Sequence, residues 1–199
     1  MFATSTATRV RVRHAGTTDV EAARTLMLRV LAEDLGYGFR PEWHADLADP
    51  AAAYLQTPGQ ALFLAEDADG TLLGTTAVKV GGPRSPQVLV DHYRGRSVAQ
   101  LARVWVLAEH RRRGAARALV ETAARWAVDE GGHRTVYLHT DTAVAGAEAF
   151  WRSLPVREVL DERVPGAELQ TVHFELDVEA LRSTAVSAAR SEGLATVRD

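Results

Sequence analysis

The sequence predicts a single α/β (α+β) domain in which a mixed central sheet of about seven strands is flanked by about four helices. Two observations support this fold class. Stretches with the pattern of strands recur along the chain, and stretches whose apolar residues lie three or four positions apart separate them. A length of 199 residues and a hydrophobic content of 46% suit one domain with a sizeable core.

The first elements expected are a strand and two helices. Residues 9–14 alternate as a strand does, and Thr18 with Glu21 has the spacing of a capping box. The helix expected next carries one apolar stripe, formed by Val20, Ala23, Met27, Val30 and Leu31. A shorter helix, interrupted near Pro50, is expected to follow it.

A hairpin is expected next, because residues 61–67 and 71–80 have the pattern of strands and Asp69-Gly70 between them is a strong turn signal. Residues 81–97 are rich in Gly, Pro and Arg and predict a long surface loop. The remaining elements expected are a strand at 99–107, a helix at 114–132 with Leu119, Ala123, Trp126 and Glu130 on one stripe, a strand at 134–140, a short helix ending before Pro155 and a hairpin at 156–176.

The chain ends in a predicted helical tail. We expect the domain to span residues 9–176 and the tail to span residues 177–199. Four tail residues form a weak apolar stripe, namely Val178, Leu181, Ala185 and Ala188. Because such a stripe suits packing against the domain or against a partner chain, we predict a homodimer.

Composition argues against several classes of protein. The net charge of −3 disfavours a general nucleic-acid binder. The absence of cysteine excludes disulfides, thiolate metal sites and a cysteine nucleophile, and no metal is expected. No apolar run reaches the roughly 18 residues of a membrane-spanning helix, and the first residues lack the apolar core of a signal peptide, so a cytoplasmic location is expected.

Three consecutive arginines separate an apolar run from a helical pattern in the stretch VWVLAEHRRRGAARALV, residues 104–120. A strand, a glycine turn and a helix N-terminus together form an anion site, because unpaired backbone N–H groups converge where the helix dipole is positive. Gly114 lets the backbone approach the anion, and arginine side chains add charge-assisted bonds to phosphate oxygens. A solvated helix start is the alternative interpretation.

This stretch resembles the pyrophosphate-binding motif of the GCN5-related N-acetyltransferase (GNAT) family, Arg/Gln-x-x-Gly-x-Gly/Ala, and the resemblance extends over residues 9–176. It implies a GNAT fold and acetyl-CoA as acyl donor, entering where the fourth and fifth strands part. It also implies that backbone groups of Val104, Trp105 and Val106 contact the pantetheine arm. The residues implied for the pyrophosphate are Arg111, Arg112, Arg113, Gly114, Ala115 and Ala116.

Two positions depart from the family pattern. The family commonly has an asparagine near the start of the helix after the fifth strand, and a tyrosine further along that often protonates the leaving thiolate. Val144 and Trp151 stand at these positions. Since an indole N–H does not donate a proton at neutral pH, the usual acid is absent. Trp151 is interpreted as an apolar wall beside the cofactor, with a place in the core as the alternative.

Two histidines are the candidate catalytic residues. Acetyl transfer needs a neutral amine, so some group must accept the proton of the ammonium form. His139 lies at the end of the strand at 134–140, beside the place where the strands are expected to part, and a histidine titrates in the useful range. His173 lies on the last strand, which in this family pairs with the fifth. We predict His139 as the general base and His173 as the second candidate; a structural role is the alternative for each.

The acceptor in this family lies against the first two helices and the loop between the third and fourth strands. Carboxylates and aromatic rings in these segments suit a cationic amine, through charge pairing and stacking. Solvated helix ends have the same composition. The candidates are Glu33, Asp34, Tyr37, Trp43, His44, His92 and Tyr93.

The leading hypothesis is an N-acetyltransferase that moves an acetyl group from acetyl-CoA to the primary amine of a small molecule by direct attack in a ternary complex. The direct route is favoured because no cysteine can carry the acetyl group. The alternative is a non-catalytic acyl-CoA-binding module or sensor, suggested by Val144 and Trp151. Neither a nucleic-acid partner nor a membrane partner is expected.

Overall fold

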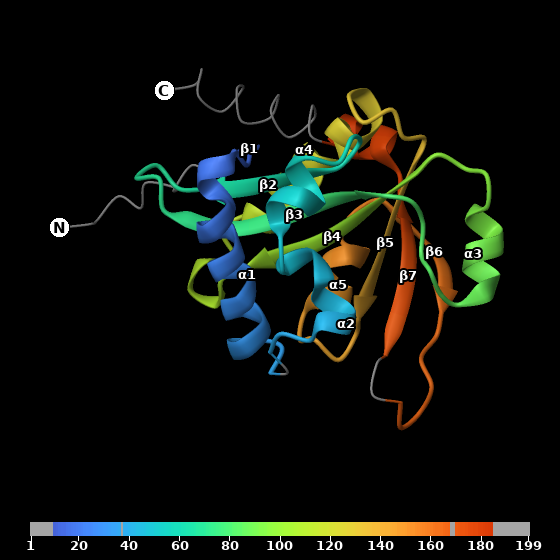
Figure 1. Ribbon diagram of the computed structural model, residues 1–199. Coiled ribbons are helices and arrows are strands. Elements are labelled where there is room, and N and C mark those ends of the chain that lie inside the picture. The colour runs from blue at the N-terminus through green and yellow to red at the C-terminus, as the bar shows by residue number, and fades with distance from the viewer. Residues whose placement is uncertain (1–9, 37, 168–169, 185–199) are drawn as a thin grey trace, which may run out of the picture. The chain divides into compact units, whose positions relative to one another are not determined.

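The computed structural model of the protein describes residues 10–36, 38–167 and 170–184. They fall into two compact units. The first unit comprises the chain up to Gly81 together with Leu101–Gly132, and the second comprises Gly82–Gln100 together with the chain from His133 onward. Seven strands form a sheet in the order β1-β2-β3-β4-β5-β7-β6, and helices flank it (Figure 1). The predicted fold class is thereby confirmed.

The strands of the first unit form an antiparallel meander. β1 (Arg11–His14) pairs with β2 (Ala61–Glu66), and β2 pairs with β3 (Leu72–Val80). The hairpin between β2 and β3 is closed by Asp67, whose carboxylate accepts the backbone N–H of Thr71 at 2.9 Å. The expected hairpin is therefore confirmed.

Lys79, the chain's one lysine, lies on β3 and is half-buried.

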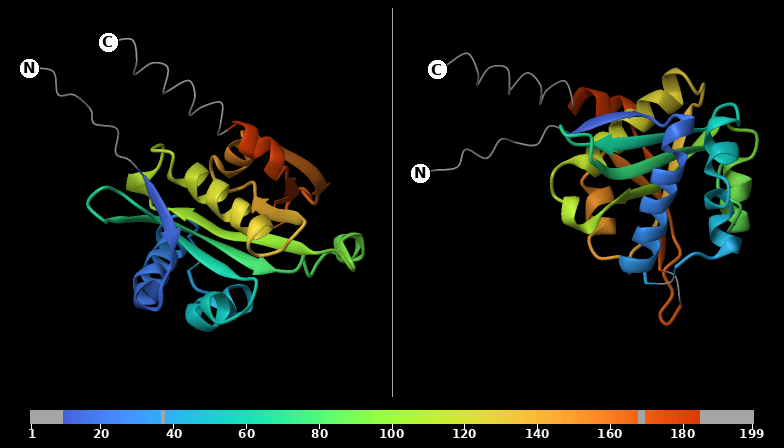
Figure 2. Two further views of the ribbon diagram at one scale, coloured as in Figure 1. Left: turned by 90° about the horizontal axis from the view of Figure 1, so that it is seen from above. Right: turned by 60° about the vertical axis from the view of Figure 1, so that its left-hand side comes forward.

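Two helices of the first unit cover opposite faces of this meander, as Figure 2 shows. α1 (Val20–Glu33) packs on one face, where Met27 shares a buried cluster with Leu62. α4 (Ala115–Asp129) packs on the other, where the Trp126 ring lies 5.9 Å from the Phe63 ring. Successive side chains of β2 thus point to opposite faces, and each face meets its own helix.

The start of α1 differs from the prediction. The helix is preceded by a 3₁₀ turn, η1 (Thr17–Asp19), and the backbone N–H of Gly16 donates to the Asp19 carboxylate at 2.7 Å. The capping box expected from Thr18 and Glu21 is therefore wrong, since the turn moves the capping interaction towards the N-terminus. The shorter helix expected around Pro50 is divided into α2 (Pro41–His44), η2 (Ala45–Leu47) and the π-helical turn η3 (Ala51–Leu55).

The second unit is built on a three-stranded antiparallel arrangement. β7 (Thr171–Leu176) pairs with β5 (Thr135–Asp141) on one side and with β6 (Val156–Asp161) on the other. α5 (Ala147–Arg152) contacts β5. β4 (Val98–Val106) starts in this unit, pairing in parallel with β5 from Val98 opposite Thr135 to Gln100 opposite Tyr137, and then continues into the first unit.

The segment expected to be a surface loop contains a helix, so that expectation is wrong. α3 (Gln87–Tyr93) begins directly after Pro86. Its Leu89 and Tyr93, four positions apart, are buried in a cluster with Tyr137. These two apolar anchors stabilise a helix within a stretch whose composition is otherwise typical of loops.

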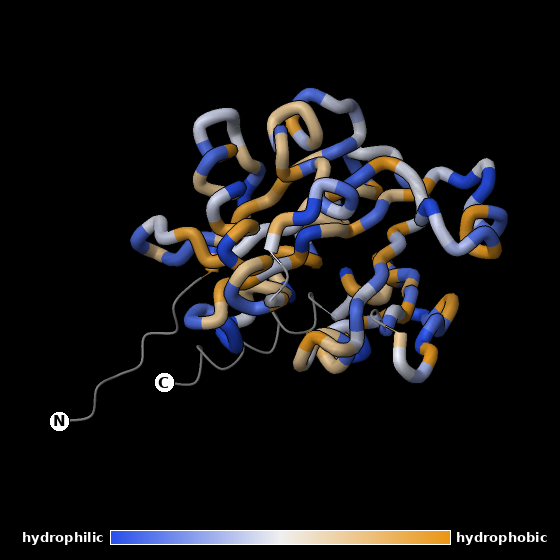
Figure 3. The backbone as a smooth tube through the Cα atoms, turned by 60° about the horizontal axis from the view of Figure 1, so that its bottom comes forward, coloured by the Kyte–Doolittle hydropathy of each residue, from blue (hydrophilic) through white to orange (hydrophobic). Residues whose placement is uncertain are grey.

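The start of the tail packs within the chain. Residues 178–184 are helical, and Val178 and Leu181 are buried. The other half of the predicted stripe, Ala185 and Ala188, lies outside the described residues. Hydrophobic residues recur through the described strands and helices (Figure 3), yet none of those helices is long and apolar enough to cross a membrane.

Candidate active site

The predicted phosphate loop has the backbone geometry of an anion site. It connects η4 (Ala108–His110) to α4, and it contains two residues with positive φ, Arg112 at 65° and Gly114 at 81°. Gly114 is the N-cap of α4, no side chain of a described residue caps this end, and the first turn holds no acidic residue. The unpaired N–H groups of a helix start and the positive end of its dipole favour an anion here.

The three arginines of this loop are not equivalent. Nε of Arg111 donates to the backbone oxygen of Val106 at 3.0 Å, and its guanidinium forms an ion pair with Asp34. Arg112 and Arg113 are exposed and form no ion pair with a described residue. Arg111 therefore holds the loop to α1 and β4, whereas Arg112 and Arg113 have the charge and the freedom to contact a phosphate.

β4 carries an irregularity just before the residues predicted to contact pantetheine. Arg103 has a φ of 54°, which is unusual for a residue with a side chain. The hydroxyl of Thr75 donates to the backbone oxygen of Arg103 at 3.1 Å. A Cβ on Gly74 would lie 2.5 Å from the backbone oxygen of Trp105, so only glycine allows β3 to approach β4 this closely. The backbone leading into Val104–Val106 is thus fixed by β3.

The side chain of Arg103 is held by an ion pair with little exposure to solvent. Its Nε and Nη2 donate to the two carboxylate oxygens of Asp46 at 2.9 and 2.7 Å, and Tyr54 also donates to that carboxylate. Burial would raise the pKa of Asp46, but the hydrogen bonds and charge of Arg103 outweigh it and lower the pKa to about 2. Asp46 therefore stays charged and fixes the side chain of the irregular residue on β4.

The predicted acceptor residues of the first unit lie at the end of α1 and on α2. Glu33 pairs with Arg29 at 2.8 Å, and Asp34 pairs with Arg111. Trp43 is 38% exposed, and the Arg40 guanidinium lies 4.5 Å from its ring.

His44, in contrast, is buried and accepts the Arg40 N–H at 2.9 Å. Its pKa is lowered, first by burial and then by the charge of Arg103, which suits a structural role. Tyr37 falls outside the described residues.

In the second unit, four polar side chains share one face of β5 and β7. Tyr137 is directly opposite Glu175, and His139 is directly opposite His173. Directly opposed residues of an antiparallel pair project to the same side of the sheet. The same register places Leu138 opposite Phe174 on the other face, where Arg152 of α5 lies over the Phe174 ring at 5.2 Å.

The two predicted catalytic histidines are bridged by a tyrosine hydroxyl. Oη of Tyr137 lies 2.6 Å from Nδ1 of His173 and 3.3 Å from Nδ1 of His139, and the two imidazole rings are 5.8 Å apart. Nε2 of His173 lies 2.5 Å from the carboxylate of Glu162. His139 is exposed, whereas His173 is only 3% exposed. The arrangement gives an accessible base with a buried hydrogen-bonded chain behind it.

The two acceptor candidates on α3 lie on this same face of the second unit. The Tyr93 ring is 5.3 Å from the Tyr137 ring, and Nε2 of His92 lies 3.6 Å from Glu175. Glu175 also pairs with Arg157 at 2.6 Å. Burial would raise the pKa of Glu175, but its bond to Arg157 leads the interactions that lower it. The face therefore keeps a carboxylate among aromatic rings.

The remaining predicted positions lie in α5 and the turn before it. Trp151 is buried, with its ring 5.0 Å from that of Phe150, so its side chain forms part of an apolar layer. Val144 lies in the turn after β5. Asp141 is the last residue of β5, and its carboxylate accepts the N–H of Ala143 in that turn at 3.0 Å.

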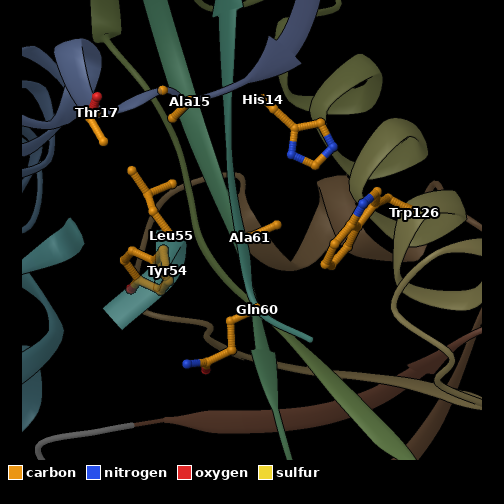
Figure 4. A pocket seen from close by; sticks show the side chains of 9 residues that line it. His14, Ala15, Thr17, Tyr54, Leu55, Gln60, Ala61 and Trp126 are labelled. Atoms are coloured by element: carbon orange, nitrogen blue, oxygen red, sulfur yellow. The ribbon is translucent and has the colours of Figure 1, made fainter. Parts of the chain in front are cut away.

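A shallow pocket of about 290 Å³ opens elsewhere in the first unit, between β1, η3 and α4 (Figure 4). His14 and Trp126 line one side of it, and Thr17 and Leu55 line the other. Of the predicted site residues that the structure describes, none contributes to it. Among the residues that the structure describes, no group of three or more His, Asp or Glu side chains is placed to hold a metal ion.

A model of the Acetyltransferase (GNAT) family matches residues 26–154 of this sequence. The chain belongs to the GNAT family. The match includes the second half of α1, the phosphate loop and β5 with His139, but it ends before β7. His173 and Glu162 consequently lie outside the part of this GNAT chain that the family model covers.

Comparison with known proteins agrees with this assignment. N-acetyltransferase 8 of Rattus norvegicus is 35% identical over 112 residues, which are 56% of this GNAT chain and 46% of that protein. The chain thus matches about half the length of this curated relative.

Two solved structures share the fold of this GNAT chain. The protein yncA from Salmonella typhimurium, solved with acetyl-CoA, superposes with a TM-score of 0.63 at 16% identity, covering 85% of this chain and 94% of that one. Spermidine N-acetyltransferase from Vibrio cholerae, in complex with CoA and spermine, gives a TM-score of 0.61 at 15% identity, covering 86% and 97%. At these identities the likeness establishes the fold.

Several residues of the site are not among those predicted from the sequence. Tyr137 stands two positions before His139, so the alternation of a strand already places both on one face. Glu162 lies in the loop after β6, and no sequence signal connects it with His173. Asp46 and Arg103 are 57 positions apart, and nothing in the sequence indicates the positive φ of Arg103.

Proposed function

We propose that this GNAT protein is an acetyl-CoA-dependent N-acetyltransferase that acetylates the primary amine of a small molecule by direct attack in a ternary complex. The observation that carries the proposal is the exposed imidazole of His139, backed by the hydroxyl of Tyr137. Family membership and the relative named as an N-acetyltransferase support acetyl transfer. The fold shared with a spermidine N-acetyltransferase supports an amine acceptor.

The donor site is assigned to β4 and the phosphate loop. The uncapped start of α4, without an acidic residue in its first turn, fits a diphosphate, and Arg112 with Arg113 adds charge to it. Backbone groups of Val104, Trp105 and Val106 are assigned to the pantetheine arm. Bound acetyl-CoA supplies the acetyl group, and every other task falls to residues of the chain. Gly114, Ala115 and Ala116 keep the pyrophosphate role that the family resemblance implies, and Arg111 is assigned to the same site as the residue that holds the loop in place. Trp151 keeps its interpretation as an apolar wall beside the cofactor.

The chemical task of the chain is to remove a proton from the acceptor. At neutral pH only about one alkylammonium in 10³ is in the neutral, nucleophilic form. A base placed beside the acceptor takes up the proton of the ammonium form and so produces the neutral nucleophile. General-base catalysis of this kind typically increases the rate by about 10²-fold to 10⁴-fold. His139 is assigned this role because it is the exposed histidine of the pair on β5 and β7. Glu175, with its aromatic neighbours, supplies negative charge on the same face for a cationic amine.

A non-catalytic acyl-CoA-binding module is the second candidate. It is favoured by Trp151, since a buried indole stands where the family often has its tyrosine acid. A thiol-release assay with acetyl-CoA against amines, amino acids, polyamines and aminoglycosides separates the two candidates. Amine-dependent release of CoA is expected from the transferase, whereas binding of acetyl-CoA without release across the whole panel would leave the binding module.

A further inference from the structure

We propose that Tyr137, His173 and Glu162 form a proton relay that carries the proton taken up by His139 away from the acceptor amine to solvent. The inference rests on the proposed function, because it assigns a task to three residues behind the proposed base. It adds Tyr137 and Glu162 to the catalytic machinery and changes His173 from a second base into a relay member.

The chain of contacts runs between two accessible ends through a buried middle. His139 is exposed at one end, and the side chain of Glu162 is 36% exposed at the other. Between them, Tyr137 has no exposed surface and His173 almost none. The successive distances from His139 to Glu162 are 3.3, 2.6 and 2.5 Å. The two shorter distances are close enough for direct hydrogen bonds, and the first is long, as catalytic contacts often are before substrate binds.

The donors and acceptors of the chain can all point the same way. A carboxylate only accepts, so Nε2 of His173 donates to Glu162, and in the neutral form of the ring Nδ1 is left as an acceptor. Tyr137 has one O–H, and it donates this proton to that Nδ1. The oxygen of Tyr137 can then accept from Nδ1 of His139. Nδ1 of His139 faces the oxygen of Tyr137, so Nε2 is assigned to receive the substrate proton. The side-chain amide of Gln100, whose nitrogen lies 3.3 Å from the same Nδ1, must then present its oxygen to that nitrogen, because an amide N–H only donates.

Each transfer breaks one N–H or O–H bond and forms another. The ammonium gives its proton to Nε2 of His139, and Nδ1–H of His139 passes to the oxygen of Tyr137. The Tyr137 proton passes to Nδ1 of His173, and Nε2–H of His173 passes to Glu162, which releases it to water. The reaction of an ammonium with a thioester yields an amide, a thiol and one excess proton, and the relay exports that proton.

The tyrosine must act without forming a free phenolate. Burial, followed by the neighbouring Tyr93 and Glu162, raises the pKa of Tyr137. Its proton therefore leaves only as another arrives, which the 2.6 Å contact to His173 permits.

The other charged groups on this face do not compete for the proton. Glu175 is paired with Arg157 at 2.6 Å and faces His92 of α3. Tyr93, also on α3, keeps its proton because burial, followed by the charge of Glu175, raises its pKa.

The first test measures the ring protons of the protein without any substrate. Nitrogen-15 NMR of the imidazole rings at neutral pH should show His173 as the neutral Nε2–H tautomer, and this signature should change in Tyr137→Phe, which removes the donor to Nδ1. An Nδ1–H tautomer of His173 in the wild type would overturn the relay. This readout does not depend on acetyltransferase activity, so it stands even if no acceptor amine is found.

The second test measures kcat and KM between about pH 6 and pH 9.5 for Tyr137→Phe and Glu162→Gln. Each variant should lose about 10-fold to 100-fold in kcat at neutral pH, keep its KM for acetyl-CoA and approach the wild-type rate as rising pH makes the amine neutral. A pH-independent loss, or a wild-type kcat at neutral pH in either variant, would overturn the relay.

The matched control for Glu162→Gln is Glu158→Gln. Glu158 is an exposed carboxylate of β6 whose ion-pair partner is Arg152 at 2.6 Å, away from His173. Its variant should keep the wild-type pH profile. Because Glu162 is partly exposed, Glu162→Gln is expected to fold even if the buried Tyr137→Phe does not, so the relay stays testable. Absence of CoA release from the wild type, in contrast, would refute the proposed function. The hydrogen-bonded chain would then be tested by the NMR measurement alone.

Discussion

His139 and His173 face each other on paired strands, but their surroundings suit different tasks. The exposed ring of His139 can reach a substrate, whereas the buried ring of His173 has both nitrogens engaged, by Tyr137 and by Glu162. A histidine with both nitrogens engaged is oriented and cannot contact an acceptor. The two residues that the sequence offered as alternatives for one role thus have separate roles in the proposed mechanism.

His139→Ala tests the proposed base. We expect kcat to fall by about 10²-fold or more because the ammonium loses its proton acceptor, while the affinity for acetyl-CoA stays near that of the wild type. Steady-state kinetics with the best amine of the panel, together with thermal shift by acetyl-CoA, measure both quantities. A variant that kept more than about a third of the wild-type kcat with an unchanged pH profile would remove the assignment.

Asp46→Asn tests the ion pair that holds Arg103. We expect a loss of about 3–5 kcal/mol in the free energy of unfolding, because the substitution leaves a largely buried guanidinium without its counter-charge. Urea unfolding measures this loss. The control is Asp91→Asn, which removes an exposed ion pair with Arg94 and should cost at most about 1 kcal/mol. Equal losses in the two variants would contradict the assignment.

The same ion pair predicts how stability depends on acidity. The pKa of Asp46 is lowered from 3.8 to about 2 in the folded state, so its contribution is fully present above the unfolded value and is lost as pH falls towards about 2. The difference in unfolding free energy between the wild type and Asp46→Asn should therefore shrink by about 2 kcal/mol between pH 5 and pH 2. Urea titrations at several acid pH values measure it, and a constant difference would argue against the lowered pKa.

At the scale of elements, the junction of β4 and α4 carries the cofactor prediction. CoA at about 100 times its dissociation constant should raise the melting temperature of the wild type by roughly 5–10 °C, since it binds the folded state alone. Gly114→Val should abolish this shift, because a β-branched residue does not adopt the φ of 81° that shapes the loop.

A matched variant separates backbone strain from loss of the phosphate site. Gly70 has nearly the same φ, 80°, and like Gly114 it has open space where a Cβ would be. Gly70→Val in the β2–β3 turn should therefore destabilise the protein similarly yet keep the response to CoA. If a folded Gly114→Val protein kept the shift, the assignment of the loop to the pyrophosphate would be withdrawn.

The elements that were predicted correctly are those with a strong local signal. The β2–β3 hairpin has a turn dipeptide between two apolar runs, and α4 follows a glycine and carries buried residues at helical spacing. α3 was missed because its seven residues lie between Pro, Gly and Arg, and its stability comes from the contacts of Leu89 and Tyr93 with residues distant in sequence. Tertiary contacts of this kind leave no local pattern.

In the candidate site, too, the features with a local sequence signal were predictable and those that depend on tertiary contacts were not. The phosphate loop is local in sequence, so a motif could indicate it, and His139 stands at a strand end where the family resemblance directs attention. The partners that define its chemistry are not local. Glu162 reaches His173 from the loop after β6, and Arg103 adopts its positive φ in contacts with η2 and β3. Such pairings follow from register and loop path, which a single sequence does not specify.

At the scale of the whole molecule, the state of assembly stays a prediction. Val178 and Leu181, half of the tail stripe, are buried within the chain and are unavailable to a partner. Any contribution of the predicted stripe to a homodimer must therefore come from its other half, Ala185 and Ala188, which lie outside the described residues.

Light scattering at micromolar concentration should give twice the mass of the chain if the prediction of a homodimer is correct. A chain ending at Thr184 keeps the buried Val178 and Leu181, and should therefore remain folded while losing the dimer if the distal tail forms the interface. A monomer from the full-length protein would refute the dimer, and a dimer from the shortened chain would assign the interface to the domain.

The half-buried Lys79 on β3 has a practical consequence for chemical labelling. A thioester can acylate an amine without a catalyst, so every lysine of a protein is a potential site of unspecific acetylation. This chain has one lysine and 22 arginines, and the guanidinium groups of the arginines stay protonated and do not react. Intact-mass spectra should therefore show at most one acetylated side-chain amine. Acetylation of an added peptide or small amine can then be measured with almost no signal from acetylation of the protein itself.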